Sequence, residues 1–120
     1  MARILLAEDD NSLRNFLAAA LERAGHELVH FDNGDEALDA LKGAAFDLLL
    51  TDIVMPGGID GVELARKAAE IDPAMKIVFI TGFAAVALNP ANQAPAKAKV
   101  LSKPFHLREL VSEVEKVMAA

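Results

Sequence analysis

Cysteine is absent from this chain of 120 residues, and its absence excludes several kinds of chemistry. A chain without thiols forms no disulfide, builds no thiolate metal site and has no thiol nucleophile. Long apolar runs are missing too: none approaches the ~20 residues that a membrane-spanning helix needs, and the chain opens without the apolar core of a signal peptide. We therefore expect a cytoplasmic protein with no membrane partner.

Basic residues are in short supply as well. The chain has 12 lysines and arginines against 18 acidic residues, which gives a formal net charge of −6. Nucleic-acid binding depends on basic side chains that neutralise phosphates, so we expect no nucleic-acid partner. With 53 % hydrophobic and 25 % charged residues the composition is otherwise that of a globular protein. A chain of this length fits one domain, which we expect to span residues 1–120 with no output domain.

Short apolar runs alternate with segments of helical periodicity along the whole chain. The pattern predicts five strands, each followed by a helix, and Asn11 or Ser12 is expected to cap the first helix. Pro90 and Pro95 follow the fourth strand, so we expect the helix there to be short or irregular. Parallel strands need crossover connections, and the alternation therefore predicts an α/β fold, a doubly wound (βα)5 sheet with helices on both faces. The predicted strands span residues 4–7, 28–31, 48–51, 76–80 and 100–101.

Polar residues follow these strands at the carboxyl edge of the sheet, where parallel sheets bind ligands. Asp9 and Asp10 come after the first strand, Asp52 after the third and Thr81 after the fourth. Lys103 follows the fifth. Taken singly, each has an ordinary structural explanation: the first two acids cap a helix, the threonine satisfies a turn and the lysine pairs with a nearby acid. That all of them fall at strand ends favours a functional site.

Three carboxylates at one edge repel one another, which costs stability unless a cation lies between them. Oxygen ligands without a neighbouring histidine or cysteine suit Mg²⁺. Asp52, delivered by the central apolar strand, is then the expected nucleophile for in-line phosphoryl transfer, and Asp9 and Asp10 are the expected metal ligands. Lys103 supplies a second positive charge, and the Thr81 hydroxyl donates to a phosphoryl oxygen.

Short motifs spread over the whole chain match one known family when they are taken together. They are Glu8-Asp9-Asp10, Asp52 with Met55-Pro56, Asp60-Gly61, Thr81-Gly82 and Lys103-Pro104-Phe105. With them the chain resembles the receiver domains of two-component response regulators. The resemblance implies a flavodoxin-like, five-stranded parallel sheet in the order 2-1-3-4-5. It also implies that a histidine kinase or a histidine phosphotransfer protein phosphorylates Asp52.

The same resemblance implies roles for residues around the acidic site. Asp10, Asp52 and the Val54 carbonyl would bind Mg²⁺, and Asp9 would hold the ion through water. A cis peptide bond is implied before Pro104, and X-Pro bonds tolerate this isomer. The chain is then a phosphoacceptor that catalyses its own phosphorylation rather than an enzyme acting on a separate substrate.

Val100 departs from the family pattern. In receiver domains the phosphoryl group draws in the hydroxyl at the Thr81 position, next to the flexible Gly82, and an aromatic residue three positions before the lysine turns inward. Val100 occupies that aromatic position here. Because valine has no ring to swing, we expect a modest population shift and an output surface that differs from the usual one.

Without an output domain, the signal is expected to leave through a protein surface. Residues 1–24 and 46–68 resemble in particular an alphaproteobacterial single-domain regulator of this family, which implies control of the ClpXP protease. The unphosphorylated form would prime the protease, and phosphorylation would switch this off. Two alternatives stay open: a constitutive binding module, or pseudo-receiver, and a relay intermediate that passes the phosphoryl group on. An Asp-x-Asp phosphatase is disfavoured because Val54 stands where the second acid is needed.

Overall fold

The computed structural model describes residues 1–55, 57–82 and 94–119. Within these ranges five parallel strands form one sheet in the order β2-β1-β3-β4-β5, which confirms the predicted fold class and strand order. Each strand lies within one or two residues of its predicted position. The strands are β1 (Arg3–Ala7), β2 (Glu27–Phe31), β3 (Leu48–Thr51), β4 (Lys76–Thr81) and β5 (Lys99–Ser102).

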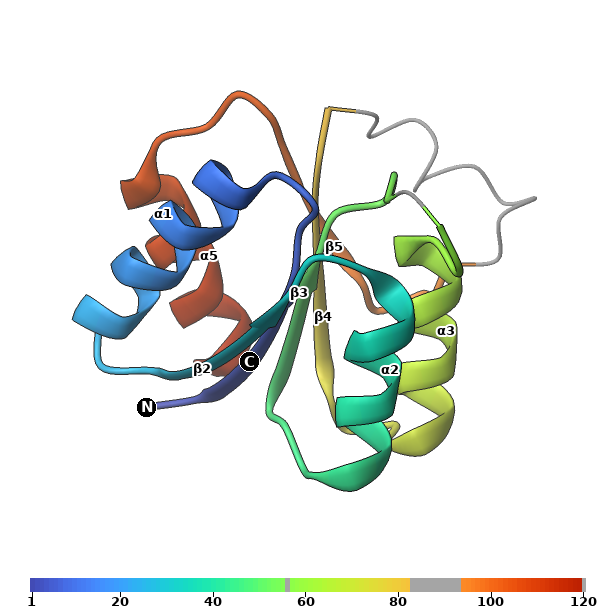
Figure 1. The fold of residues 1–120 in the computed structure, drawn as a ribbon. Coiled ribbons are helices and arrows are strands. Elements are labelled where there is room, and N and C mark those ends of the chain that lie inside the picture. The colour runs from blue at the N-terminus through green and yellow to red at the C-terminus, as the bar shows by residue number, and fades with distance from the viewer. Residues whose placement is uncertain (56, 83–93, 120) are drawn as a thin grey trace.

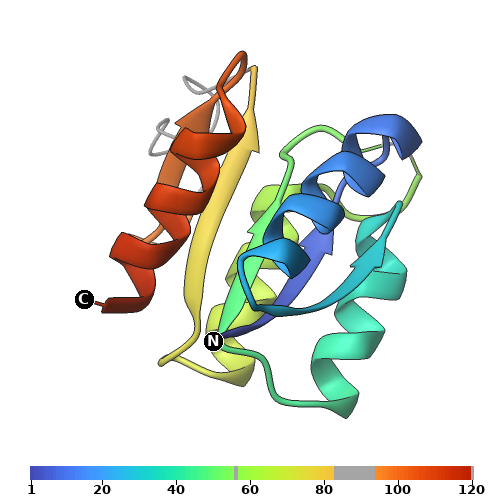
Figure 2. The same cartoon turned by 90° about the vertical axis from the view of Figure 1, so that its left-hand side faces the viewer.

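Helices cover both faces of the sheet (Figure 1). Two of them, α1 and α5, lie on one face and the other two, α2 and α3, on the opposite face; the turned view has α1 and α5 in front of the sheet (Figure 2). The short or irregular helix predicted between β4 and β5 falls on a segment that lies largely outside the described residues. No helix in the described ranges is long and apolar enough to cross a membrane. The helices are α1 (Asn11–Arg23), α2 (Gly34–Gly43), α3 (Gly61–Ile71) and α5 (Leu107–Ala119).

Both faces of the central strands are buried, which explains why they are continuous apolar runs in the sequence. Successive side chains of a strand point to opposite faces of the sheet. In β1, Ile4 and Leu6 pack with the apolar residues of α1 and α5. Leu5 and Ala7 pack instead with those of α2 and α3. The sheet therefore separates two hydrophobic cores and fixes the direction of each strand end.

The pairing of the strands decides which residues meet at the carboxyl edge. The last residues of β1 and β3 are paired, so Glu8 and Asp52, which follow them, leave the sheet side by side. The last residues of β4 and β5 are paired as well, so Thr81 and Lys103 reach the same edge. Residues from four strands are therefore collected at one end of the molecule.

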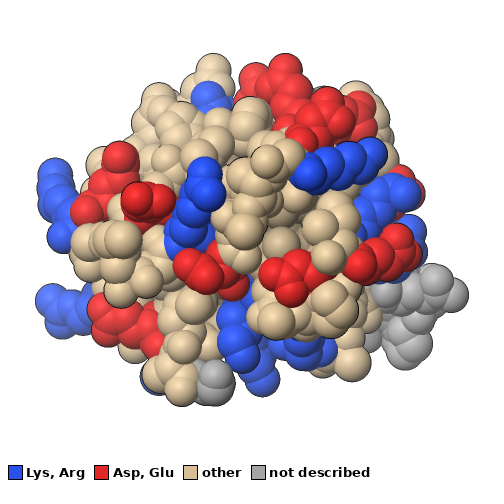
Figure 3. All heavy atoms as spheres, turned by 90° about the horizontal axis from the view of Figure 1, so that it is seen from below, with Lys and Arg blue, Asp and Glu red and all other residues tan. Residues whose placement is uncertain are grey.

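The opposite edge of the sheet, where the strands begin, carries charges of both signs. Figure 3 shows basic and acidic side chains interspersed over this face. Arg3 lies there, with its guanidinium carbon 4.9 Å from the centre of the Phe46 ring. Its backbone N–H donates to a carboxylate oxygen of Asp47 at 2.8 Å, and its guanidinium donates to the Ala45 carbonyl at 3.2 Å. These contacts fasten the connection between α2 and β3 to the start of β1.

Candidate functional site

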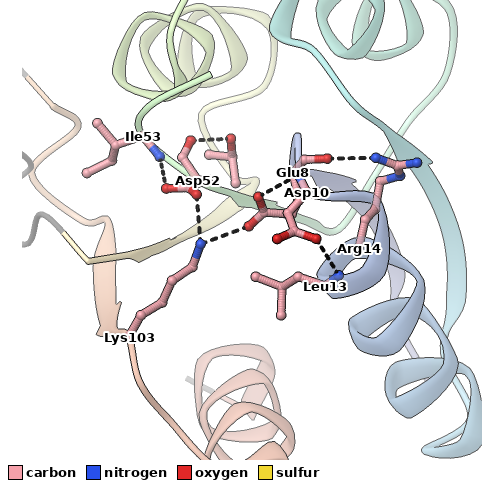
Figure 4. A network of polar contacts seen from close by, with 8 residues as sticks. Glu8, Asp10, Leu13, Arg14, Asp52, Ile53 and Lys103 are labelled. Atoms are coloured by element: carbon pink, nitrogen blue, oxygen red, sulfur yellow. Dashed lines mark hydrogen bonds and ion pairs between the residues drawn. The ribbon is translucent and has the colours of Figure 1, made fainter. Parts of the chain in front are cut away.

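Asp52 follows directly after β3, and its side chain is held at both carboxylate oxygens. The residue is 7 % exposed. The backbone N–H of Ile53 donates to Oδ1 at 2.7 Å, and the Lys103 ammonium donates to Oδ2 at 2.8 Å (Figure 4). The backbone N–H of Asp52 itself donates to the Ala7 carbonyl at 3.0 Å. The carboxylate is thus fixed in direction at the edge of the sheet.

Lys103 reaches this site from the end of β5. Its ammonium also donates to Glu8 Oε1 at 3.1 Å, so one cation bridges two carboxylates (Figure 4). Burial lowers the pKa of the lysine, but its hydrogen bonds to Asp52 and Glu8 outweigh burial, and the pKa is raised overall. Its backbone N–H donates to the Thr81 carbonyl at 2.8 Å. The Lys103-Pro104 peptide bond is cis, as the family resemblance implied.

Three acids form a cluster beside this lysine: Glu8, Asp9 and Asp52. Each offers a carboxylate oxygen, and these oxygens all lie within 4.8 Å of one another. Glu8 and Asp52 are buried, whereas Asp9 is exposed. A set of carboxylate oxygens open to water on one side fits Mg²⁺, which prefers oxygen ligands and keeps several waters. The residues present therefore suit the predicted cation.

Asp10 caps a helix and is not one of the three clustered acids. Its carboxylate accepts the backbone N–H of Leu13 at 3.0 Å and so forms the N-cap of α1. The cap predicted at Asn11 or Ser12 was therefore one or two residues late. Aspartate is among the preferred N-cap residues, because its side chain satisfies an amide of the first turn that has no partner within the helix. Glu8 is the third acid of the cluster, and the metal-binding role expected for Asp10 stays a prediction.

The signal for Glu8 in the sequence is its position directly after a predicted strand, which the motif of three acids does not single out. Glu8 follows the last residue of β1 just as Asp52 follows the last residue of β3, and these two last residues are paired across the sheet. Two acids in equivalent positions after neighbouring strands are expected to meet. Asp10 lies two residues further on, past the strand end, where it caps the helix that follows.

Glu8 is in an unusual electrostatic environment for an acidic residue, because only 1 % of its surface is exposed to solvent. Its pKa is raised from 4.5 to about 7: burial is the largest cause, hydrogen bonds from the Asp10 N–H and Lys103 lower the pKa in part, and the carboxylates of Asp9 and Asp52 also raise it. A cation among the three acids would favour the ionised form of Glu8. Repulsion among the three carboxylates thus favours binding of a cation at this cluster.

This environment predicts a pH-dependent stability in the absence of divalent cations. Because the pKa of Glu8 is raised on folding, its stabilising contribution is complete below pH 4.5 and is lost as the pH rises to about 7. Over that interval the free energy of unfolding of the wild type should fall by roughly 2–3 kcal/mol relative to Glu8→Gln. Urea unfolding of both proteins at several pH values measures this difference. If the free energies of unfolding of the two proteins changed with pH in parallel, the raised pKa assigned to Glu8 would be refuted.

The other predicted residues lie close by but are not members of the cluster. Thr81 is the last residue of β4 and is fully buried, and Gly82 after it is exposed. Val54 lies two residues after Asp52 in the loop, with its side chain 55 % exposed. Val100 lies opposite Phe79 in the pairing of β4 with β5 and packs, half-buried, against the core of α2 and α3. The functional roles expected for these residues stay predictions.

Comparison with known proteins establishes the family. Residues 4–115, which include every residue of the cluster, match the response regulator receiver domain family. The chain therefore belongs to this family, as its motifs indicated, and is a signalling protein of a two-component system.

Individual relatives define its position within the family. The chain is 66 % identical over 120 residues to the response regulator receiver protein CpdR of Brucella abortus (strain 2308), with 100 % of this chain and 99 % of that protein covered. It is 33 % identical over 119 residues to the sensor kinase CckA of the same bacterium, covering 98 % of this chain but 12 % of the kinase. The crystal structure of a response regulator receiver protein from Sinorhizobium medicae WSM419 matches with a TM-score of 0.89 at 36 % identity, covering 98 % and 94 % of the two chains. The protein is thus closely related to CpdR.

Proposed function

We propose that Asp52 is the phosphoacceptor of this receiver domain and that its donor is the phosphohistidine of a histidine kinase or histidine phosphotransfer protein. A carboxylate oxygen of Asp52 attacks the phosphorus. The phosphorus–nitrogen bond to the imidazole breaks, and the imidazole nitrogen keeps the electron pair and takes up a proton. The observation that carries the proposal is the buried carboxylate itself, fixed by the Lys103 ammonium at 2.8 Å within a cluster of three acids.

The neighbouring residues have distinct proposed roles in this transfer. Glu8, Asp9 and Asp52 hold Mg²⁺, together with the Val54 carbonyl that the family resemblance implies. When bound, the ion neutralises charge on the phosphoryl oxygens. Lys103 bridges two of the acids in the apo protein, and it contributes a hydrogen bond and a positive charge to the transferred group. The chain in this way promotes its own phosphorylation and acts on no separate substrate.

Thr81 and Val100 are the proposed parts of the switch. Thr81 is buried at the end of β4, and its hydroxyl donates to a phosphoryl oxygen after transfer. Val100 packs against the core from β5 and has no ring that could move between exposed and buried positions. Phosphorylation shifts an equilibrium only by its different interaction with the two states, so the shift is modest and its output surface is unusual for the family.

The proposed output is a protein–protein interaction in the cytoplasm, made by a surface of the receiver itself. The 66 % identity to the response regulator receiver protein CpdR supports the choice of partner. On that relationship we propose that the unphosphorylated form primes the ClpXP protease and that phosphorylation of Asp52 releases it.

Intact mass tests the phosphoacceptor. After incubation with a small-molecule phosphodonor, the wild type should gain one phosphoryl group only when Mg²⁺ is present, and Asp52→Asn should gain none. Asp39→Asn, which changes an exposed aspartate of α2, should behave as the wild type. Purified ClpXP should then bind the unphosphorylated wild type and Asp52→Asn, but it should not bind the phosphorylated wild type. No mass gain in the wild type would leave the constitutive binding module as the better explanation.

A further inference from the structure

Arg14, in the first turns of α1, joins three separate segments around the acidic cluster. Its Nη1 donates to the Glu8 carbonyl at 3.0 Å, its Nη2 to Asn11 Oδ1 at 2.7 Å and its Nε to His30 Nδ1 at 3.2 Å. Figure 4 shows the Arg14 guanidinium beside the Glu8 carbonyl, on the side of the cluster away from Lys103. The end of β1, the start of α1 and the end of β2 are therefore tied to one side chain.

Arg14 forms hydrogen bonds to the residues immediately before and after Asp9. The backbone N–H of Arg14 donates to the carbonyl of Asp10 at 2.8 Å, and its guanidinium donates to the carbonyl of Glu8. The two carbonyls on either side of Asp9 are thus held by a single residue. The N–H of Glu8 donates to the Phe31 carbonyl at 3.1 Å, so the chain just before Asp9 is anchored on its other side as well.

Asp9 is the member of the cluster that needs such support. The carboxylates of Glu8 and Asp52 are buried and are fixed by Lys103 and by backbone N–H groups. Asp9 is exposed, so the packing of neighbouring side chains does not set the direction of its carboxylate. That direction depends on the backbone of the turn between β1 and α1, which is the part of the chain that Arg14 holds.

We propose that Arg14 is a positioning residue that keeps the Asp9 carboxylate aimed at the divalent cation; the inference rests on the Mg²⁺-dependent function proposed above. This inference predicts a change in Mg²⁺ affinity opposite to the change that the charge of the arginine alone would produce. If the arginine acted only through its charge, its removal would tighten Mg²⁺ binding, because a cation near the site repels the metal ion. If it acts by holding Asp9, its removal weakens binding. Loss of groups that orient metal ligands typically costs 10–100-fold in affinity.

Isothermal titration calorimetry with MgCl₂ measures this affinity directly, and it suits a chain that lacks tryptophan and tyrosine. Arg14→Ala should raise the Kd for Mg²⁺ about tenfold. Arg14→Lys keeps the charge but lacks the planar fork that reaches several acceptors, so it should also weaken binding, by less. Arg23→Ala, which removes an exposed charge from the last turn of the same helix, should change the Kd less than twofold.

A double-mutant cycle with Asp9→Asn shows whether the arginine acts through Asp9. In that background Arg14→Ala should add little, because the carboxylate that it positions is already gone. Equal fold-changes in both backgrounds, or tighter Mg²⁺ binding by Arg14→Ala, would overturn the inference while leaving the proposed function intact. A wild type that binds no Mg²⁺ would overturn both. Should Arg14→Ala fail to fold, Arg14→Lys alone and with Asp9→Asn carries the same cycle.

Discussion

Replacing Lys103 by methionine should slow the Mg²⁺-dependent phosphorylation of Asp52 by about 100-fold or more. The ammonium lies 2.8 Å from Asp52 Oδ2 and 3.1 Å from Glu8 Oε1, and in the proposed function it neutralises the transferring oxygens. Removing one such preorganised donor from an active site typically costs 10²–10³ in rate. Methionine keeps an unbranched apolar side chain that is one atom shorter than that of lysine, so the change tests the charge. Intact mass at a series of times after addition of the phosphodonor gives the rate.

Lys99 provides the matched control for this experiment. It is an exposed lysine at the other end of β5, and Lys99→Met should be phosphorylated at the wild-type rate. A Lys103→Met rate within threefold of the wild type would show that the ammonium neutralises the apo cluster only. Its part in phosphoryl transfer would then have to be abandoned.

Gly61→Ala should destabilise the protein strongly, by about 3 kcal/mol or more. Gly61 opens α3 directly against the backbone after β3: a Cβ atom there would lie 1.8 Å from the Asp52 carbonyl oxygen and 2.9 Å from the Ile53 Cα. The clash is with backbone, which cannot rotate away as a side chain can. Relief requires moving the segment that carries Asp52 and breaks the Gly61 N–H bond to the Ile53 carbonyl, 2.8 Å long. Urea unfolding monitored by circular dichroism measures the loss.

Gly43→Ala is the matched control, since a Cβ atom at this last residue of α2 meets nothing within 4 Å. Alanine is favoured over glycine in a helix, so this change should leave stability unaltered or raise it by up to about 1 kcal/mol. The pair separates close backbone approach at Gly61 from the general effect of replacing a glycine. If the two variants were equally stable, the tight junction between Asp52 and α3 would be refuted.

The sequence predicted the fold because local and long-range signals agree in this chain. The β3 run Leu48–Thr51 is three leucines followed by a β-branched threonine, and such runs occur where both faces of a parallel strand are covered. Once the strands are parallel, their carboxyl ends must share an edge of the sheet. Asp52 and Lys103 each follow a strand, so both are expected at that edge. The structure places these two side chains in direct contact, although they are 51 residues apart in the chain.

The details that the sequence did not yield depend on strand register and on side-chain direction. Whether Glu8 or Asp10 joins the cluster is decided by where β1 stops relative to β3. The motif of three consecutive acids does not show this by itself; the positions of the strand ends do. The role inferred for Arg14 depends on the folding of its side chain back onto the Glu8 carbonyl. In the sequence it is an ordinary basic residue of an amphipathic helix.

Localising the phosphoryl group tests the central claim most directly. Protein phosphorylated in the presence of Mg²⁺ is treated with borohydride, which reduces an aspartyl phosphate to homoserine, and the digested peptides are then sequenced by mass spectrometry. The account predicts homoserine at position 52 and at no other aspartate. Modification at Asp9, or a phosphoryl group on His26, His30 or His106 instead, would contradict the assignment of Asp52 as the phosphoacceptor.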